Sequence, residues 1–246
     1  MERKLQSITE PRAIALDWLF ICLKTYHYPG AENWFEKIVS PATNVVILRN
    51  GLDLREPLLP YATANKILPC LVDAPTQFDD ATQSFTQQGP ARLIIPQHQL
   101  SLPLQRLLEA GTITVQLSTD FKTASWEKLI ESASLGAITC LTERTCKVFQ
   151  QKDIWELYRK SLEEGVRVAR ADGAHIQDNY TDAILEKLKT YPPQKGSSML
   201  SDRLAGRPIE VMAKSGIISQ KAKKLGISAP LHDSFTALLQ GINNQD

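Results

Sequence analysis

The stretch Asn44-Val45-Val46-Ile47-Leu48 decides the fold, because no polar residue interrupts it after Asn44. Such a run predicts a strand buried on both faces, as in a parallel sheet covered by helices. Residues 13–23 form a second, nearly continuous apolar run, and a helix-like stretch over residues 31–39 lies between the two runs. This order of strand, helix and strand predicts a βαβ unit.

The rest of the first half continues this alternation. Short apolar runs predict further strands at residues 67–72, 93–95 and 113–117. Residues 101–110 predict a helix, with Ser101 as its N-cap and Gly111 at its end. The first half is therefore expected to form a mainly parallel sheet with helices on its faces.

From about residue 121 the strand signals disappear. Apolar residues recur at helical spacing over residues 154–169, and Gly173 ends that helix. Further helices are predicted at residues 181–188, 198–205, 208–226 and 233–240. The domain boundary is expected near residues 118–122, which gives an α/β domain over residues 1–119 and an all-α domain over residues 120–246.

The composition argues against several classes of protein. With 246 residues, 43% of them hydrophobic and 22% charged, the chain is typical of a globular protein. The net charge of +1 provides no strong field for nucleic acid or an anionic membrane. The run over residues 13–23 is too short to span a bilayer. Four scattered cysteines and four scattered histidines predict a reducing, cytoplasmic environment and no metal site.

Two motifs in the second half carry a family resemblance. The lysine motif is Trp126-Glu127-Lys128-Leu129, and the serine–glutamate motif runs from Ser197-Ser198-Met199-Leu200 to Arg207-Pro208-Ile209-Glu210. With them the chain resembles the ketopantoate reductase (2-dehydropantoate 2-reductase) family from about residue 14 to residue 239. The resemblance implies an incomplete Rossmann-like, mainly parallel sheet followed by an all-α C-terminal domain.

The resemblance also implies a function. The chain is expected to be an NADP-dependent oxidoreductase of pantothenate biosynthesis, which reduces 2-dehydropantoate (ketopantoate) or a related 2-keto acid. Lys128 would protonate the substrate carbonyl, Ser198 would contact the substrate, and Glu210 would lie near the nicotinamide ribose and the substrate. Lys24, after the first strand, would lie beside the cofactor phosphates. Asn50, after the second strand, would contact both cofactor and substrate.

Each of these residues also has a structural interpretation. Lys128 could be a solvated helix lysine, and Ser197 or Ser198 only an N-cap. Glu210 could be a carboxylate in the first turn of a helix, where the helix dipole favours it. Asn50, followed by Gly51, could form a bare turn.

The chain departs from the family around the substrate. Ser132 and Gly136 stand where the family usually has asparagines that face the hydroxyl end of the substrate. Met212 stands where an aspartate is common, and Lys195 where a polar substrate contact is frequent. Ser132 is therefore the candidate substrate contact at this point. A 2-keto acid other than ketopantoate becomes an open alternative.

The first 16 residues contain no GxGxxG sequence, the loop whose backbone N–H groups hold a pyrophosphate. Relative to the family, the sequence begins inside the Rossmann-like domain. Two functions stay open: an NADP-dependent reductase, or a non-catalytic, truncated family member that serves as a binding or dimerisation module. The second predicts an exposed apolar sheet edge at residues 13–23. A homodimer is one expected assembly.

Overall fold

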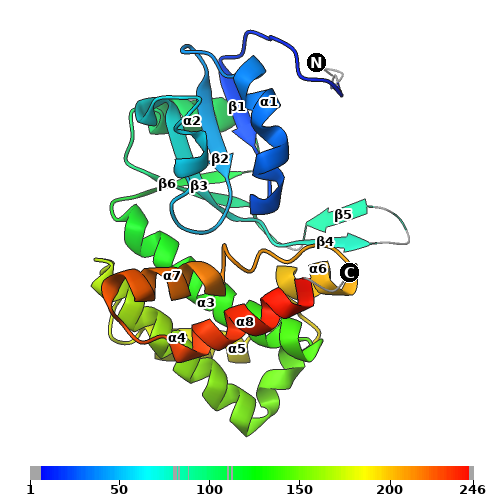
Figure 1. Ribbon diagram of the computed structural model, residues 1–246, viewed down its shortest axis with the longest axis vertical. Helices are drawn as coiled ribbons and strands as arrows, with labels where there is room; N and C mark the ends of the chain where they lie inside the picture. The colour runs from blue at the N-terminus through cyan, green and yellow to red at the C-terminus, as the bar shows by residue number, and fades with distance from the viewer. Residues whose placement is uncertain are drawn as a thin grey trace. The chain divides into compact units, whose positions relative to one another are not determined.

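The computed structural model describes residues 7–79, 82, 84–87, 89–109, 111 and 113–243. The chain divides into two compact units (Figure 1). The sheet unit comprises the described residues up to Arg49 and those from Asp53 to Thr119. The helical unit comprises Asn50–Leu52 and the described residues from Asp120 onward. The predicted fold class, a mainly parallel sheet followed by an all-α region, is confirmed.

The sheet unit is built on five strands in the order β1-β2-β3-β6-β7. Their bounds are β1 Trp18–Ile21, β2 Asn44–Leu48, β3 Ile67–Asp73, β6 Arg92–Pro96 and β7 Thr114–Ser118. Strands β1, β2 and β3 pair in parallel, as do β6 and β7, but β3 and β6 are antiparallel. The sequence missed this pair, which follows from the β4–β5 hairpin between the two strands, Thr76–Asp79 and Ser84–Gln87. Antiparallel neighbours need no crossover helix.

Helices α1 (Tyr28–Ile38) and α2 (Ser101–Leu108) belong to this unit. Helix α1 begins with Pro29 in its first turn and buries residues at helical spacing, namely Tyr28, Ala31 and Phe35. The prediction for Ser101 was wrong: Leu100 occupies the N-cap position, and Ser101 Oγ donates a 2.7 Å hydrogen bond to the Pro96 carbonyl oxygen.

Strand β1 lies at the edge of the sheet, and it is much shorter than the run of residues 13–23 that predicted it. An edge strand extends only as far as its single neighbour pairs with it, and β2 pairs with β1 from Trp18 to Ile21. Phe20 is 37% exposed there. A pocket of about 560 Å³ follows this edge and α1, and its lining includes Leu19, Ile21, Trp34 and Ile38. An apolar edge is therefore present.

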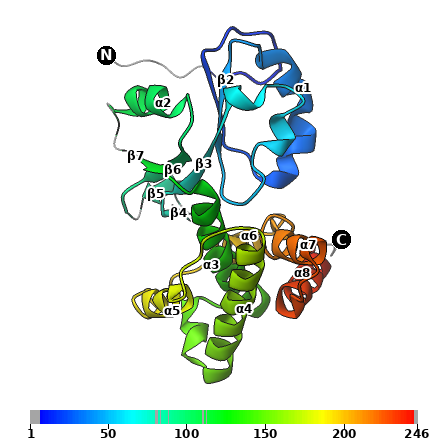
Figure 2. The same cartoon turned by 90° about the vertical axis from the view of Figure 1, so that its left-hand side faces the viewer.

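The helical unit surrounds α3 (Phe121–Thr142), as Figure 2 shows. The other helices are α4 Lys152–Ala171, α5 Tyr180–Lys189, α6 Ser198–Leu204, α7 Ser215–Leu225 and α8 Pro230–Asn243. Helices α4, α6, α7 and α8 all contact α3. Gly165 lets α4 approach α3 closely, because a Cβ there would lie 3.1 Å from Ile130. The described residues also contain four short 3₁₀ helices, at Thr25–His27, Glu56–Leu58, Ala64–Lys66 and Cys146–Gln150.

Two helix predictions in this unit need correction. Pro208 does not open a helix, because the segment before Ser215 is non-helical. The Asn243 side chain accepts from Ile209 N and donates to Ile209 O, both at 2.8 Å, so this segment bonds to a side chain instead. The last helix is longer than predicted. Its N-terminus is capped from outside, since the Glu164 carboxylate accepts from His232 N at 2.7 Å and Leu231 N at 3.2 Å. No helix in the described residues is long and apolar enough to cross a membrane.

Candidate active site

The lysine motif lies in the second turn of α3. Trp126 and Leu129 are fully buried, and Trp126 Nε1 donates a 3.0 Å hydrogen bond to the Asp172 carboxylate. Lys128, between these two anchors, is only half-buried. Because successive helix residues point about 100° apart, anchoring Trp126 and Leu129 in the core turns Lys128 to another face. The motif therefore fixes the direction of its lysine.

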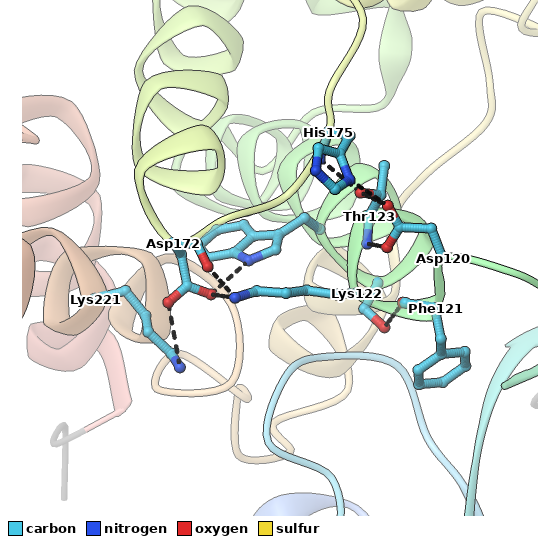
Figure 3. Close-up of polar contacts among 9 residues, drawn as sticks. Asp120, Phe121, Lys122, Thr123, Asp172, His175 and Lys221 are labelled. Atoms are coloured by element: carbon cyan, nitrogen blue, oxygen red, sulfur yellow. Dashed lines mark hydrogen bonds and ion pairs between the residues drawn. The ribbon is translucent and has the colours of Figure 1, made fainter. Parts of the chain in front are cut away.

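The N-terminus of α3 is held by a group of contacts that we call the α3 clasp (Figure 3). The Asp120 carboxylate caps the helix, accepting from Thr123 N at 3.0 Å and from Thr123 Oγ1 at 2.7 Å. His175 Nδ1 lies 2.8 Å from the same carboxylate. The backbone hydrogen bond from Thr123, followed by the His175 contact, lowers the pKa of Asp120 to about 2. Asp120 is thus held as an anion where the helix dipole favours one.

Asp172 forms the other half of the clasp (Figure 3). Besides Trp126, its carboxylate meets Lys122 Nζ at 3.2 Å and Lys221 Nζ at 3.9 Å. Lys122 Nζ also donates to the Asp172 carbonyl oxygen. These contacts tie α3 to the end of α4 and to α7. The helix that carries Lys128 is therefore fixed at its base.

The serine–glutamate motif opens α6 beside α3. Ser197 is the N-cap, since its Oγ accepts from Leu200 N at 3.0 Å, and it also lies 2.7 Å from Thr139 Oγ1 of α3. Ser198, the first residue of the helix, is exposed. Gly136 allows α6 to pack closely, because a Cβ there would lie 2.7 Å from Met199 Sδ. Ser197 therefore caps the helix, and the hydroxyl of Ser198 does not.

The charged residues of this motif hold α6 in place. Arg203 donates to the Cys140 carbonyl oxygen in the last turn of α3 and forms a 2.5 Å ion pair with Glu143. A cation there complements the C-terminal end of the helix dipole. The buried Asp202 carboxylate accepts from Arg207 Nε at 3.1 Å. Much of the motif is thus structural, and it sets the path of the chain up to Glu210.

Glu210 lies in the non-helical segment before α7 and is half-buried. Its interpretation as a first-turn helix carboxylate is therefore wrong. The neighbouring Ile209 is buried and held at both backbone groups by Asn243, as described above. This pairing fixes the backbone next to the carboxylate.

Ser132 follows Lys128 by one turn of α3, and its Oγ accepts a 2.9 Å hydrogen bond from Lys214 Nζ. Lys214 was not among the residues predicted for the site. A signal was present, because Lys214 is a charged residue within a mainly apolar segment that also contains Val211 and Ile218.

All the candidate site residues except Lys24 belong to the helical unit. Asn50 lies two residues after the end of β2, and the next residue, Gly51, has a φ of 129°, a conformation that favours glycine. Leu52 packs against the core of the helical unit. Asn50 thus belongs to the same unit as the candidates of α3, α6 and the segment before α7, namely Lys128, Ser132, Ser198 and Glu210. Lys24 follows β1 in the sheet unit.

A Rossmann-like sheet followed by a helical region defines a class of two-part α/β proteins. The chain belongs to the ketopantoate reductase PanE/ApbA family: the family model for the C-terminal part matches residues 120–243, and the other family model matches residues 2–99.

In the described residues, no group of three or more His, Cys, Asp or Glu side chains could hold a metal ion.

Curated relatives and solved structures agree with this assignment. The chain is 31% identical to a 2-dehydropantoate 2-reductase of Mycobacterium tuberculosis, over 94% of this chain and 78% of that protein. It is 28% identical to the Caulobacter vibrioides protein of the same name, over 94% and 79%. The fold matches a dimeric ketopantoate reductase from Staphylococcus aureus with a TM-score of 0.84, at 23% identity over 92% of this chain and 77% of that chain.

The sheet unit can be compared with what a dinucleotide-binding sheet requires. Asn50 follows the carboxyl end of a parallel strand, where open α/β sheets bind their ligands. The connection between β1 and α1, residues 22–27, contains no glycine, so it forms no glycine-rich pyrophosphate loop. The described residues therefore include a strand end of the kind that binds ligands, while the β1–α1 connection offers no glycine-rich loop for a pyrophosphate.

Proposed function

We propose that this chain is an NADPH-dependent reductase that converts 2-dehydropantoate, or a related 2-keto acid, into the 2-hydroxy acid. One observation carries the proposal: a half-buried lysine on a rigidly anchored helix, an exposed serine, a half-buried glutamate and the Asn50 loop belong to one compact unit. The family membership and the names of the relatives support the same reaction.

Lys128 is the proposed proton donor. Reduction of a keto group leaves a negative charge on its oxygen, and an ammonium group within hydrogen-bond reach of that oxygen can stabilise the charge and supply the proton. The α3 clasp and the buried Trp126 hold the helix at the base of this lysine. A fixed backbone limits the positions that the flexible side chain can take.

The other residues bind and orient. Ser198 would hold the substrate by a hydrogen bond from its hydroxyl, and Glu210 would accept hydrogen bonds from the substrate or the ribose of the cofactor. Asn50 would contact both cofactor and substrate, and the Lys24 ammonium group would attract the cofactor phosphates. When it is bound, the nicotinamide supplies the hydride.

We also propose a domain organisation, a cellular location and an oligomeric state for the protein. Residues 1–119 would form the partial nucleotide-binding domain, and residues 120–246 the domain that binds the substrate. The protein would act in the cytoplasm as a homodimer, which sedimentation of the purified chain would check. A non-catalytic binding module is the less favoured alternative, because the relatives in view carry the names of reductases.

The test is NADPH oxidation with 2-dehydropantoate, measured as the loss of NADPH absorbance. Lys128→Ala is expected to lower kcat by about 10²–10⁴-fold, the usual contribution of a positioned acid. Lys160→Ala, at an exposed lysine of α4, is the matched control and should keep wild-type activity. Equal rates for Lys128→Ala and the wild type would remove Lys128 from the mechanism. No turnover of any 2-keto acid by the folded wild type, with NADPH or NADH, would refute the function.

A further inference from the structure

Strand β1 lies at an edge of the sheet but has the composition of a covered strand. Among the described strands it pairs only with β2, yet residues 18–23 are apolar without a break. Such a run is typical of a strand that is covered on both faces. Strand β7, at the other edge of the same sheet, alternates instead, with polar residues at Thr114, Gln116 and Ser118. The two edges are therefore built differently, and only β7 has the polar residues that keep an edge apart from other chains.

The apolar surface of β1 continues around both faces of the strand. Trp18 and Phe20 lie on one face, where their rings stack at 6.5 Å and Phe20 stays 37% exposed. Successive side chains of a strand alternate, so Leu19 and Ile21 lie on the opposite face, beside Trp34 of α1 in the pocket of about 560 Å³. The open side of β1 is thus an apolar groove on both sides of its backbone.

The backbone of this edge offers hydrogen-bonding groups to a further strand. The Asp17 carbonyl oxygen accepts from Asn44 N at 2.9 Å, so residue 17 points its backbone groups at β2. In a parallel ladder the residues that bond to one neighbour alternate with those that point away from it. Trp18 and Phe20, and Cys22 just after the strand, therefore direct their N–H and C=O groups outward. Their spacing is symmetric about Phe20.

We propose that the β1 edges of two copies of this chain pair as antiparallel strands about a two-fold axis at Phe20. This inference gives the homodimer proposed above an interface, and it rests on that part of the proposed function. Phe20 lies opposite Phe20 of the second copy, and Trp18 lies opposite Cys22. Opposite residues of this kind exchange both of their backbone hydrogen bonds, so the outward groups of all three residues are satisfied.

The charges that flank the groove favour an identical, antiparallel strand. Asp17 precedes the apolar run and Lys24 follows it, and the backbone of Lys24 is still extended. Antiparallel pairing brings Asp17 of each copy toward Lys24 of the other, whereas parallel pairing would bring like charges together. No charged residue lies between them to repel a second copy. A second copy therefore matches this edge in hydrogen bonding, polarity and charge, and a two-fold dimer is the commonest symmetric assembly.

The first test is sedimentation equilibrium of the full chain. The wild type should form a dimer, and Phe20→Lys should raise the dimer Kd about tenfold or more, because two ammonium groups then face each other at the axis. Phe20 is partly exposed, so the substitution spares the core of the sheet. Leu117→Lys, at a 45% exposed residue of β7, is the matched control and should keep the wild-type Kd.

The second test fixes the register. Phe20→Cys is combined with Cys22→Ala, which removes the exposed cysteine and leaves the buried ones. Opposite residues that exchange hydrogen bonds have Cα atoms about 5.5 Å apart, so a short bismaleimide should link the two cysteines into a covalent dimer. Leu117→Cys in the same background is the control and should stay unlinked.

A wild type that remains monomeric would overturn both this inference and the proposed homodimer. A dimer that Phe20→Lys leaves intact, or that Phe20→Cys does not link, would overturn this interface alone, since the homodimer would then use another face. Should Phe20→Lys fail to fold by circular dichroism, the crosslinking result decides. Neither test needs substrate or cofactor, so a failure of the reductase activity in the NADPH assay would be seen separately.

Discussion

The two units of the molecule bury different kinds of side chain. In the described part of the sheet unit, the buried polar residues are the hydroxyls Thr43 and Ser101. The helical unit buries ionisable side chains as well, namely Glu164, Asp202, Lys214 and His232. The sheet is thus an apolar scaffold. The helical unit gives up some stability to hold polar groups in fixed positions, which is a common feature of functional sites.

The physical basis of this difference lies in the elements themselves. The central strand β2 has no exposure at Val45, Val46 and Ile47, because it pairs on both sides and is covered on both faces. Helices leave unsatisfied backbone groups at their ends, so a bundle offers buried positions at which a polar side chain finds a partner. Glu164 at the start of α8 is one such case.

The largest expected effect is on the anchor of the lysine motif. Trp126→Ala should lower the free energy of unfolding by about 3–5 kcal/mol, because it removes a fully buried indole and its hydrogen bond to Asp172. Urea denaturation followed by circular dichroism measures this loss. Trp126→Phe keeps most of the packing and should lose clearly less. A loss under about 1 kcal/mol for Trp126→Ala would show that the helical core does not depend on this anchor.

A second prediction uses the buried histidine of the helical unit. Burial lowers the pKa of His232 to about 4, so the unfolded chain takes up this proton near its ordinary pKa of about 6.5 and the folded chain only near 4. The contribution of this pKa difference to the free energy of unfolding is fully present above about pH 6.5. It is lost as the pH falls toward 4, and the loss amounts to about 3 kcal/mol at most. His232→Gln should remove this part of the pH dependence in urea titrations.

The sheet unit offers the matched control for that experiment. Ile47→Val should cost about 0.5–1.5 kcal/mol, and the same amount at every pH, because no ionisable group is changed. A pH dependence of unfolding that is identical in His232→Gln and the wild type would contradict the role of His232.

The smallest effect is expected at the α3 clasp. The pKa of Asp120, lowered to about 2 chiefly by the Thr123 N–H, means that its stabilisation is present above the ordinary carboxyl range and is lost as the pH falls through about 2. Its side chain is 40% exposed, so Asp120→Asn should cost only about 1 kcal/mol near neutral pH. Thermal unfolding at neutral and acid pH checks this. A larger gap between wild type and variant at acid pH than at neutral pH would contradict it.

Local patterns predicted a good part of this fold. The apolar run at residues 44–48 coincides with β2, and Gly226 ends α7 in the left-handed conformation. These predictions held because strand burial and helix termination depend on neighbouring residues. The apparent strand at residues 13–23 was too long, since the length of an edge strand is set by its partner.

The candidate site was likewise predicted only in part from the sequence. The two motifs led to the family and to Lys128, Ser198 and Glu210, whose roles remain predictions. The sequence left open whether Ser197 or Ser198 caps α6, and the structure shows that Ser197 is the cap while Ser198 stays exposed. Nor did the sequence show that Glu210 lies outside a helix, because that depends on Asn243, 34 residues away from Ile209.

The sequence by itself determined the five strands of the main sheet, the mainly helical second half, the apolar character of the sheet and the family, since these follow from local spacing and short motifs. Only the tertiary structure decided that β3 and β6 run antiparallel, that the α3 clasp joins Asp120 to His175, and that Lys214 turns inward onto Ser132. Each of these contacts joins residues far apart in the chain. Their free energy depends on packing that no local pattern records.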